Sequence, residues 1–92
     1  MSTLTPLRFG DLRGTIYDYT EAGDRLSMHT HDETTVHISI IGRGSFKIRG
    51  EEWEIIGKAG DVIDWRPYQA HEFIALEDNS RLINIVKNKI TD

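Results

Sequence analysis

Three of the four histidines lie within nine consecutive positions, at His29, His31 and His37. His29 and His31 are two residues apart, and the residues around them alternate as they would along a β-strand. Residues i and i+2 of a strand share a face and have Cα atoms about 7 Å apart, so both imidazoles can reach one metal ion. His71 begins a later apolar run and is the third candidate ligand, which folding would bring to the pair. The pattern predicts a sheet metal site; the alternative is a chance cluster of surface histidines.

Composition narrows the classes of protein that this chain can be. Its 92 residues suit one domain with a thin core, and 38% apolar with 28% charged residues is typical of a globular chain. A net charge of −4 without a basic cluster argues against nucleic-acid binding, and no apolar run approaches the roughly 18 residues of a membrane span. The absence of cysteine excludes disulfides and thiolate ligands. With no recognisable signal peptide, the sequence predicts a cytoplasmic protein.

The elements that position the histidines are predicted to be strands. Short β-branched and aromatic runs are separated by glycine-marked turns, and no helical periodicity extends over ten residues. We expect about eight strands, near residues 15–19, 25–31, 34–41, 45–49, 52–56, 62–65, 70–76 and 81–87. Residues 6–11 form a lead-in with a short edge strand at 7–9, and residues 89–92 form a tail. Short strands at this spacing predict a sandwich or barrel.

Two motifs in the chain resemble those of the cupin superfamily. Gly23 is followed after five residues by His29-Thr30-His31 and then by Gly42, which resembles the first cupin motif: glycine, five residues, His-x-His, three residues, glutamate, six residues, glycine. Gly60-Asp61, with His71 ten residues after the aspartate, resembles the second motif. The resemblance extends from Gly23 to about Val86. It implies an all-β, single-domain jelly-roll barrel (a double-stranded β-helix) over residues 1–92, with its core at about 12–87, a metal inside and commonly a homodimer.

The resemblance also implies a ligand set. It assigns His29, His31 and His71 to one divalent transition metal, which three histidines do not identify among Fe, Mn, Ni, Zn and Cu. Thr35 occupies the position of the family's glutamate ligand, so the usual carboxylate is missing. The family's Pro-x-Gly turn is replaced by Arg66-Pro67-Tyr68, and Ala75 stands where the family has asparagine.

These departures suggest residues for the substrate pocket and for catalysis. Thr35, Arg66, Tyr68 and Phe73 are the pocket candidates. If Thr35 faces the metal, strand alternation places His37 on the same inner face, as a fourth ligand, a partner of the ligands or a general base. His37 is accordingly the predicted catalytic residue; its alternatives are a structural role inside the barrel or exposure to water. The loop acids Asp32 and Glu33 are further replacements for the missing carboxylate.

The resulting functional prediction is a metal-dependent cupin that acts on a small, anionic organic molecule. As an enzyme it would be an oxygenase, isomerase or lyase, because a metal without a carboxylate ligand is a strong Lewis acid. The alternative from a different class is a barrel that binds or senses a sugar or metabolite without catalysis. Both versions predict a homodimer that buries an apolar sheet face, with no nucleic-acid or membrane partner.

Overall fold

The computed structural model describes residues 2–29 and 34–88, and within these ranges the chain forms nine strands and no helix. No helix of the described residues is therefore long and apolar enough to cross a membrane. The strands are β1 (Ser2–Phe9), β2 (Leu12–Tyr19), β3 (Arg25–His29), β4 (Thr34–Arg43), β5 (Ser45–Arg49), β6 (Glu54–Lys58), β7 (Val62–Asp64), β8 (His71–Ala75) and β9 (Ser80–Asn88).

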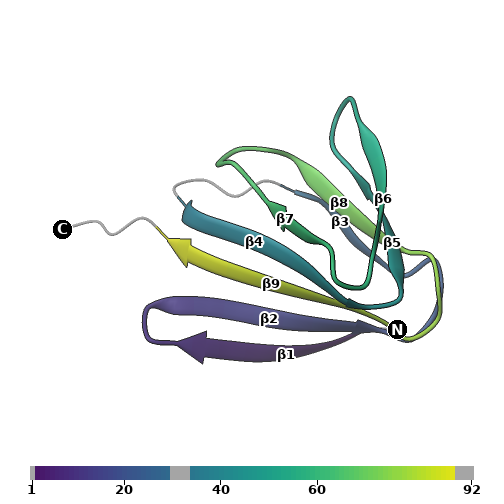
Figure 1. The fold of residues 1–92 in the computed structure, drawn as a ribbon, viewed down its shortest axis with the longest axis horizontal. Coiled ribbons are helices and arrows are strands. Elements are labelled where there is room, and N and C mark those ends of the chain that lie inside the picture. Colours follow the sequence, from purple (N-terminus) through teal and green to yellow (C-terminus); the bar gives the residue numbers. More distant parts are fainter. Residues whose placement is uncertain (1, 30–33, 89–92) are drawn as a thin grey trace.

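The strands form two antiparallel sheets that face one another (Figure 1). The five-stranded sheet has the order β1-β2-β9-β4-β7, and the four-stranded sheet has the order β3-β8-β5-β6. Consecutive strands repeatedly change sheets, so β4 and β5 belong to different layers although only Gly44 separates them. Gly44 has a φ of 77°, and a side chain there would collide with Ser80. The predicted all-β jelly-roll architecture is confirmed.

Several strands have other bounds than predicted, and two of these differences have a clear physical reason. The predicted lead-in is a full edge strand, β1, which pairs with β2 along its whole length. Pro6 falls within it, and an edge strand accommodates proline because one side of its backbone needs no ladder partner. β6 begins at Glu54, two residues later than predicted, because Gly50 N–H donates to Trp53 C=O (3.0 Å) and closes a turn over these residues.

A β-bulge changes which side chains of β3 point inward. The sequence alternation predicts Leu26 and His29 on opposite faces, since they are three residues apart. In the structure Leu26 pairs with Phe73 and His29 pairs with His71, with a register shift between the two pairs. The extra residue turns both Leu26 and His29 toward the interior, as a bulge does. The alternation predicted for this strand is therefore wrong between Leu26 and His29.

Large apolar side chains close one end of the barrel interior. The buried cluster consists of Tyr19, Ile41, Phe46, Ile48, Trp65, Phe73, Ala75 and Leu82, drawn from both sheets. Aromatic rings meet edge to face within it, with centroids 5.8 Å apart for Tyr19 and Phe46 and 6.2 Å apart for Phe46 and Phe73. These edge-to-face contacts stabilise the core in addition to the stability gained by burying the apolar surface of the rings.

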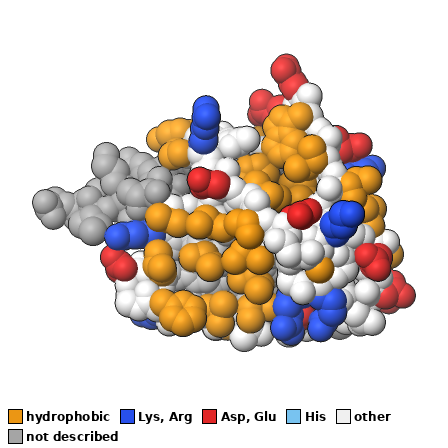
Figure 2. Space-filling view, viewed as in Figure 1, with side chains coloured by type: hydrophobic (Ala, Val, Ile, Leu, Met, Phe, Trp, Pro, Cys, Tyr) orange, Lys and Arg blue, Asp and Glu red, His pale blue; other side chains and the backbone are white. Residues whose placement is uncertain are grey.

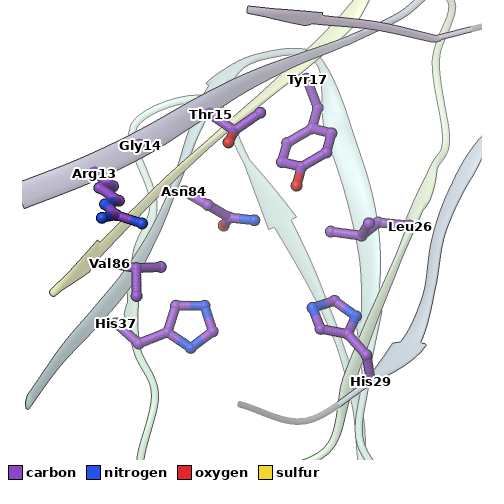
Figure 3. A pocket seen from close by; sticks show the side chains of 9 residues that line it. All are labelled: Arg13, Gly14, Thr15, Tyr17, Leu26, His29, His37, Asn84 and Val86. Carbon is purple, nitrogen blue, oxygen red and sulfur yellow. The ribbon is translucent and has the colours of Figure 1, made fainter. Parts of the chain in front are cut away.

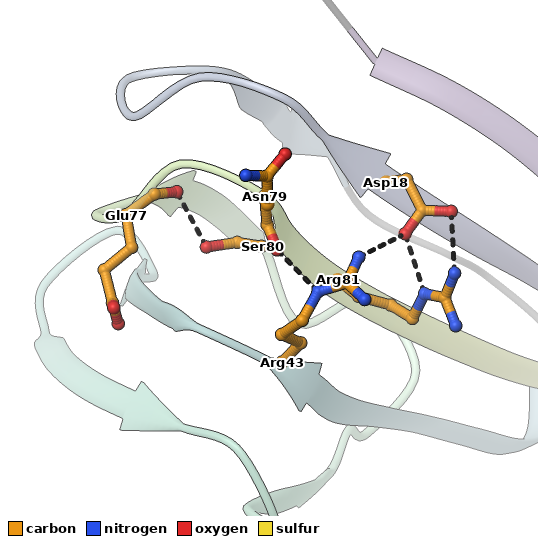
Figure 4. A network of polar contacts seen from close by, with 6 residues as sticks. All are labelled: Asp18, Arg43, Glu77, Asn79, Ser80 and Arg81. Atoms are coloured by element: carbon orange, nitrogen blue, oxygen red, sulfur yellow. Dashed lines mark hydrogen bonds and ion pairs between the residues drawn. The ribbon is translucent and has the colours of Figure 1, made fainter.

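A polar network joins three strands of the five-stranded sheet near this closed end (Figure 4). Arg81 on β9 donates to both carboxylate oxygens of Asp18 on β2, at 2.7 and 3.2 Å. Arg43 on β4 lies 3.5 Å from the same carboxylate and donates to the backbone oxygen of Asn79 (2.7 Å). The network therefore holds β2, β9 and β4 together on the outside of the sheet.

Candidate metal and ligand site

The three described histidines with inward side chains come from both sheets. His29 and His71 are register partners on β3 and β8, and their ring centroids are 4.4 Å apart. His37 enters from β4 in the opposite sheet, with its ring centroid 5.0 Å from that of His71. Folding therefore brings together three imidazoles that lie up to 42 positions apart in the chain.

Burial removes one of the alternatives considered for His37. Its side chain is only 2% exposed, so it does not face water. The same alternation buries Ser39 and Ile41 on the inner face of β4 and leaves Val36, Ile38 and Ile40 on the outer face. His37 is an interior residue, as the inward assignment of this face predicted.

Backbone carbonyls determine which nitrogen of two imidazoles carries the hydrogen. Nδ1 of His29 lies 2.6 Å from the Ser27 oxygen, and Nδ1 of His71 lies 2.8 Å from the Gln69 oxygen. A carbonyl oxygen only accepts, so each Nδ1 is the donor. In the neutral rings the lone pair is then on Nε2, the nitrogen that metal-binding histidines of this kind present.

The rings of both tryptophans form a stack against the ring of His71. The Trp65 ring stacks on the His71 ring, with centroids 4.4 Å apart and planes inclined by 22°. Trp53 stacks in turn on Trp65, with centroids 5.7 Å apart. The backbone N–H of Trp65 donates to the backbone carbonyl of His37 (2.8 Å), which ties the end of β7 to β4. Both tryptophans of the chain thus lie in one stack that ends at a candidate ligand.

A cavity of about 310 Å³ adjoins the histidines, which is at the small end of the usual range for ligand pockets (Figure 3). Its lining consists of Arg13, Gly14, Thr15, Tyr17, Leu26, His29, His37, Asn84 and Val86. Among the described residues, the lining includes an arginine and no carboxylate. Figure 3 shows the rings of His29 and His37 on opposite sides of the space, with Arg13, Thr15, Tyr17 and Asn84 beyond them. The cavity is therefore suited to an oxygen-rich, anionic molecule of small size.

The other predicted site residues lie elsewhere. Arg66 is exposed, and Tyr68 is 66% exposed beside Trp53 in a separate surface groove. Phe73 is fully buried in the core, with its ring centroid 6.2 Å from that of His71. None of these three residues lines the histidine cavity.

Several predicted positions lie outside the described residues. These are His31, Asp32 and Glu33, and the side chain of Thr35, whose backbone belongs to β4. Within residues 2–29 and 34–88, no group of three or more His, Cys, Asp or Glu side chains is arranged so that it could hold a metal. The predicted three-histidine ligand set, which includes His31, therefore stays a prediction.

Sequence reasoning missed four polar residues of the cavity: Arg13, Thr15, Tyr17 and Asn84. The first three follow one face of β2, but the predicted strand began only at Thr15, so Arg13 was not placed on it. Asn84 is flanked on both sides by apolar residues in the run 82–86, so it was assigned to that strand without a role of its own. A polar residue on the buried face of such a strand is itself a signal, because burying an amide is costly unless it has a partner or a function.

Comparisons with known proteins agree with this fold. The model of the AraC-like ligand binding domain matches residues 12–86. A sequence search of curated proteins finds no match. KdgF from Halomonas sp. is similar in structure, with a TM-score of 0.80 and 19% identity over 97% of this chain and 80% of that one.

Two further solved structures are also similar. An RmlC-like cupin protein from Desulfovibrio desulfuricans has a TM-score of 0.83 and 15% identity, over 97% of this chain and 84% of that one. A cupin 2 conserved barrel domain protein from Salinispora arenicola has a TM-score of 0.80 and 17% identity, over 95% of this chain and 76% of that one. At such identities the likeness shows the fold alone. The match over residues 12–86, most of the chain, shows more: this chain belongs to the AraC-like ligand-binding domain family and has the cupin fold.

Proposed function

We propose that the barrel binds a small organic anion beside a divalent transition metal held by His29, His31 and His71. The observation that carries this proposal is the convergence of His29, His37 and His71 next to a cavity whose described lining includes Arg13 and no carboxylate. Two imidazoles that share a tetrahedral ion through Nε2 have ring centres about 5 Å apart, given metal–nitrogen distances of about 2.0–2.1 Å. The ring centroids of His29 and His71 are 4.4 Å apart, close enough for one ion to reach both rings, and the donor role of each Nδ1 leaves Nε2 as the metal-binding nitrogen.

When bound, the metal would act as a Lewis acid toward an oxygen atom of the ligand. We assign His37 the role of proton donor and acceptor for that ligand. It lies on the cavity wall opposite His29, and its burial keeps bulk water from competing for the proton. As an enzyme the protein would be an oxygenase, isomerase or lyase.

A non-catalytic binding module is the second candidate, and the match to a ligand-binding domain family favours it. The two candidates differ in what happens to the ligand. Mass spectrometry of molecules released from the purified protein, before and after hours of incubation, distinguishes them. A binding module returns the ligand unchanged, whereas an enzyme converts it.

Metal content tests the site directly. Protein purified without a histidine tag should carry one metal ion per chain, and His71→Ala and His31→Ala should each lose most of it. His37→Ala is the matched control, because it removes a neighbouring imidazole that the proposal does not use as a ligand. Trp65 stacks on His71, so tryptophan fluorescence should follow metal titration independently. Equal metal content in the wild type and His71→Ala would contradict the proposed metal site.

The proposal includes a homodimer formed through the outer face of the five-stranded sheet. Strand register places Ile16, Ile83, Ile40 and Val62 in one row across β2, β9, β4 and β7. Leu7, Ile85 and Ile38 form the neighbouring row. Figure 2 shows the hydrophobic side chains gathered over these strands. An apolar patch of this extent is typical of an interaction surface.

Sedimentation at micromolar concentration should give twice the 10.5 kDa of one chain. Ile83→Glu should shift the equilibrium to the monomer, because a dimer would bury the added carboxylate. Ile56→Glu is the control, since Ile56 is exposed on the outer face of the other sheet. A wild-type mass near 10.5 kDa would contradict the dimer.

A further inference from the structure

A buried hydrogen-bond chain fixes the orientation of one polar group of the cavity. Trp65 Nε1 lies 2.8 Å from Ser39 Oγ, and Ser39 Oγ lies 2.5 Å from Asn84 Oδ1. An indole N–H only donates, so the serine oxygen accepts from Trp65 and directs its own hydrogen to Asn84. The reverse orientation of the Asn84 amide would leave the buried serine hydrogen facing an NH₂ group. The Asn84 oxygen therefore faces Ser39.

The other end of the Asn84 amide is consequently a donor on the cavity side. Asn84 is only 6% exposed, and its NH₂ group has no hydrogen-bond acceptor among the described residues. Figure 3 places its nitrogen toward the space between the histidines and Tyr17. An amide donor that the protein leaves unmatched at a cavity wall is available to a ligand or to water.

Arg13 supplies a second donor on the same wall. Neither an ion pair nor a hydrogen bond of its side chain occurs within residues 2–29 and 34–88, although the chain is acidic overall. Strand register places Arg13, Val86 and His37 in one row across β2, β9 and β4, and Asn84 on the next inward-facing row. With strands about 4.8 Å apart, the Cα atoms of Arg13 and His37 are about 10 Å apart. Arg13 and His37 therefore belong to the same wall of the cavity, and His29 lies on the opposite side (Figure 3).

We propose that Arg13 and Asn84 together bind the carboxylate of the ligand, and that the ligand is a small hydroxylated carboxylic acid. A guanidinium and an amide NH₂ offer donors only, which match the acceptor-only oxygens of a carboxylate. The hydroxyl groups of Thr15 and Tyr17 line the same space and suit hydroxyls of the ligand, and Val86 and Leu26 contact its carbon chain. This inference rests on the proposed ligand site and assigns the residues that determine its specificity.

Matched pairs of acid and alcohol test the inference: gluconate with glucitol, glycerate with glycerol, and lactate with propane-1,2-diol. Isothermal titration calorimetry, which can be applied to the wild type and to every variant, should show that an acid binds at least about 10-fold more tightly than its alcohol. Arg13→Gln and Asn84→Asp should each weaken that acid by about 10- to 100-fold. Arg8→Gln is the charge-matched control: Arg8 pairs with Arg13 across β1 and β2 but does not line the cavity.

Three results would overturn the inference: no acid of the set binds, acid and alcohol bind equally, or Arg8→Gln weakens binding as much as Arg13→Gln. Repeating the titrations on metal-loaded protein, chelator-treated protein and His71→Ala separates this inference from the proposed function. Acid binding that requires Arg13 in all three preparations supports the carboxylate site even if the metal proposal fails. Acid binding that requires His71 but neither Arg13 nor Asn84 overturns this inference and leaves the metal proposal standing.

Discussion

The two ends of the barrel interior are built from the same strands but have opposite chemistry. Along the inner face of β4, His37 and Ser39 at one end give way to Ile41 at the other. Along β8, His71 is followed by Phe73 and Ala75. One end is a polar cavity and the other is a closed apolar cluster. The comparison suggests that the closed end stabilises the fold, so that the polar end is free to carry function.

The energetic basis of the difference is the kind of contact at each end. Phe46, Ile48 and Leu82 are fully buried at the closed end. Burying a large apolar side chain contributes about 1.5–3 kcal/mol to the free energy of unfolding. Burial also raises the pKa of the Tyr19 hydroxyl, which keeps this region neutral. The polar end depends on directional hydrogen bonds, each with a net contribution of about 0.5–1.5 kcal/mol. Substitutions at the two ends should therefore have different effects.

The largest effect is expected at the closed end. Phe46→Ala should lower the free energy of unfolding by about 3–5 kcal/mol, because it removes a fully buried ring that contacts Tyr19 and Phe73. Urea denaturation measures the loss. Ile56→Ala, at a 69% exposed position, should stay within about 0.5 kcal/mol of the wild type. Similar losses for the two variants would mean that the closed cluster is not the main source of stability.

A smaller loss is expected from the hydrogen-bond chain of the polar end. Ser39→Ala should cost about 1–3 kcal/mol, because it leaves Trp65 Nε1 and Asn84 Oδ1 without their buried partner. It should also release the Asn84 amide and weaken binding of the carboxylic acids proposed above. Ser45→Ala is the control, since its bond to Glu77 is exposed. A Ser39→Ala protein as stable as Ser45→Ala would show that the chain contributes little.

His37→Ala should affect stability less than Phe46→Ala, because the removed ring borders a cavity and is not packed on all sides by core side chains. Metal affinity should fall by no more than about 10- to 100-fold, as for a residue that supports the ligands rather than binding the ion. A fluorescence titration with Zn²⁺ measures it, with His71→Ala as the reference for full loss. If the two variants lose metal equally, His37 is a ligand and its assigned role is wrong.

Much of the fold could be predicted from the sequence. Alternation in 34–41 and the glycine-marked turns set most strands, and the spacing of the two motifs predicted the cupin fold that the comparisons show. The bulge in β3 could not be predicted, because an inserted residue leaves no mark in a short apolar and polar alternation. β1 was underestimated because Pro6 disfavours a strand except at an edge, so the predicted edge strand began only after it, at residue 7.

Site residues could be predicted where the residue type alone indicates the chemistry. They could not be predicted where their position in the site depends on which strands pair and in what register. Histidines are conspicuous, so His29, His37 and His71 were considered from the beginning. Arg13 and Asn84 reach the same cavity only because β2, β9 and β4 are neighbours in the sheet, which is a long-range fact. Arg66 and Tyr68 were chosen because they replace motif residues, yet they lie outside the cavity.

The smallest effect is expected for the ion pair outside the closed end. The Arg81 guanidinium, through its hydrogen bond, lowers the pKa of Asp18. A carboxyl group with a lowered folded-state pKa stabilises the fold above its unfolded pKa of about 3.9, and this contribution is lost as the pH falls through the folded value. Asp18→Asn should cost less than about 1 kcal/mol at pH 7, since solvent screens the partly exposed pair.

The wild type and Asp18→Asn should therefore become equally stable as the pH falls below about 4, which acid-dependent urea denaturation measures. Asp11→Asn is the matched control at the other end of the sheet. A hydrogen bond from Lys87 lowers the pKa of Asp11 as well, but Asp11 is more exposed, so its substitution should matter less. A stability difference for Asp18→Asn that does not change with pH would show that Asp18 contributes through packing rather than through its charge. In that case the bidentate contact with Arg81 would not be what holds β2 to β9 at the closed end.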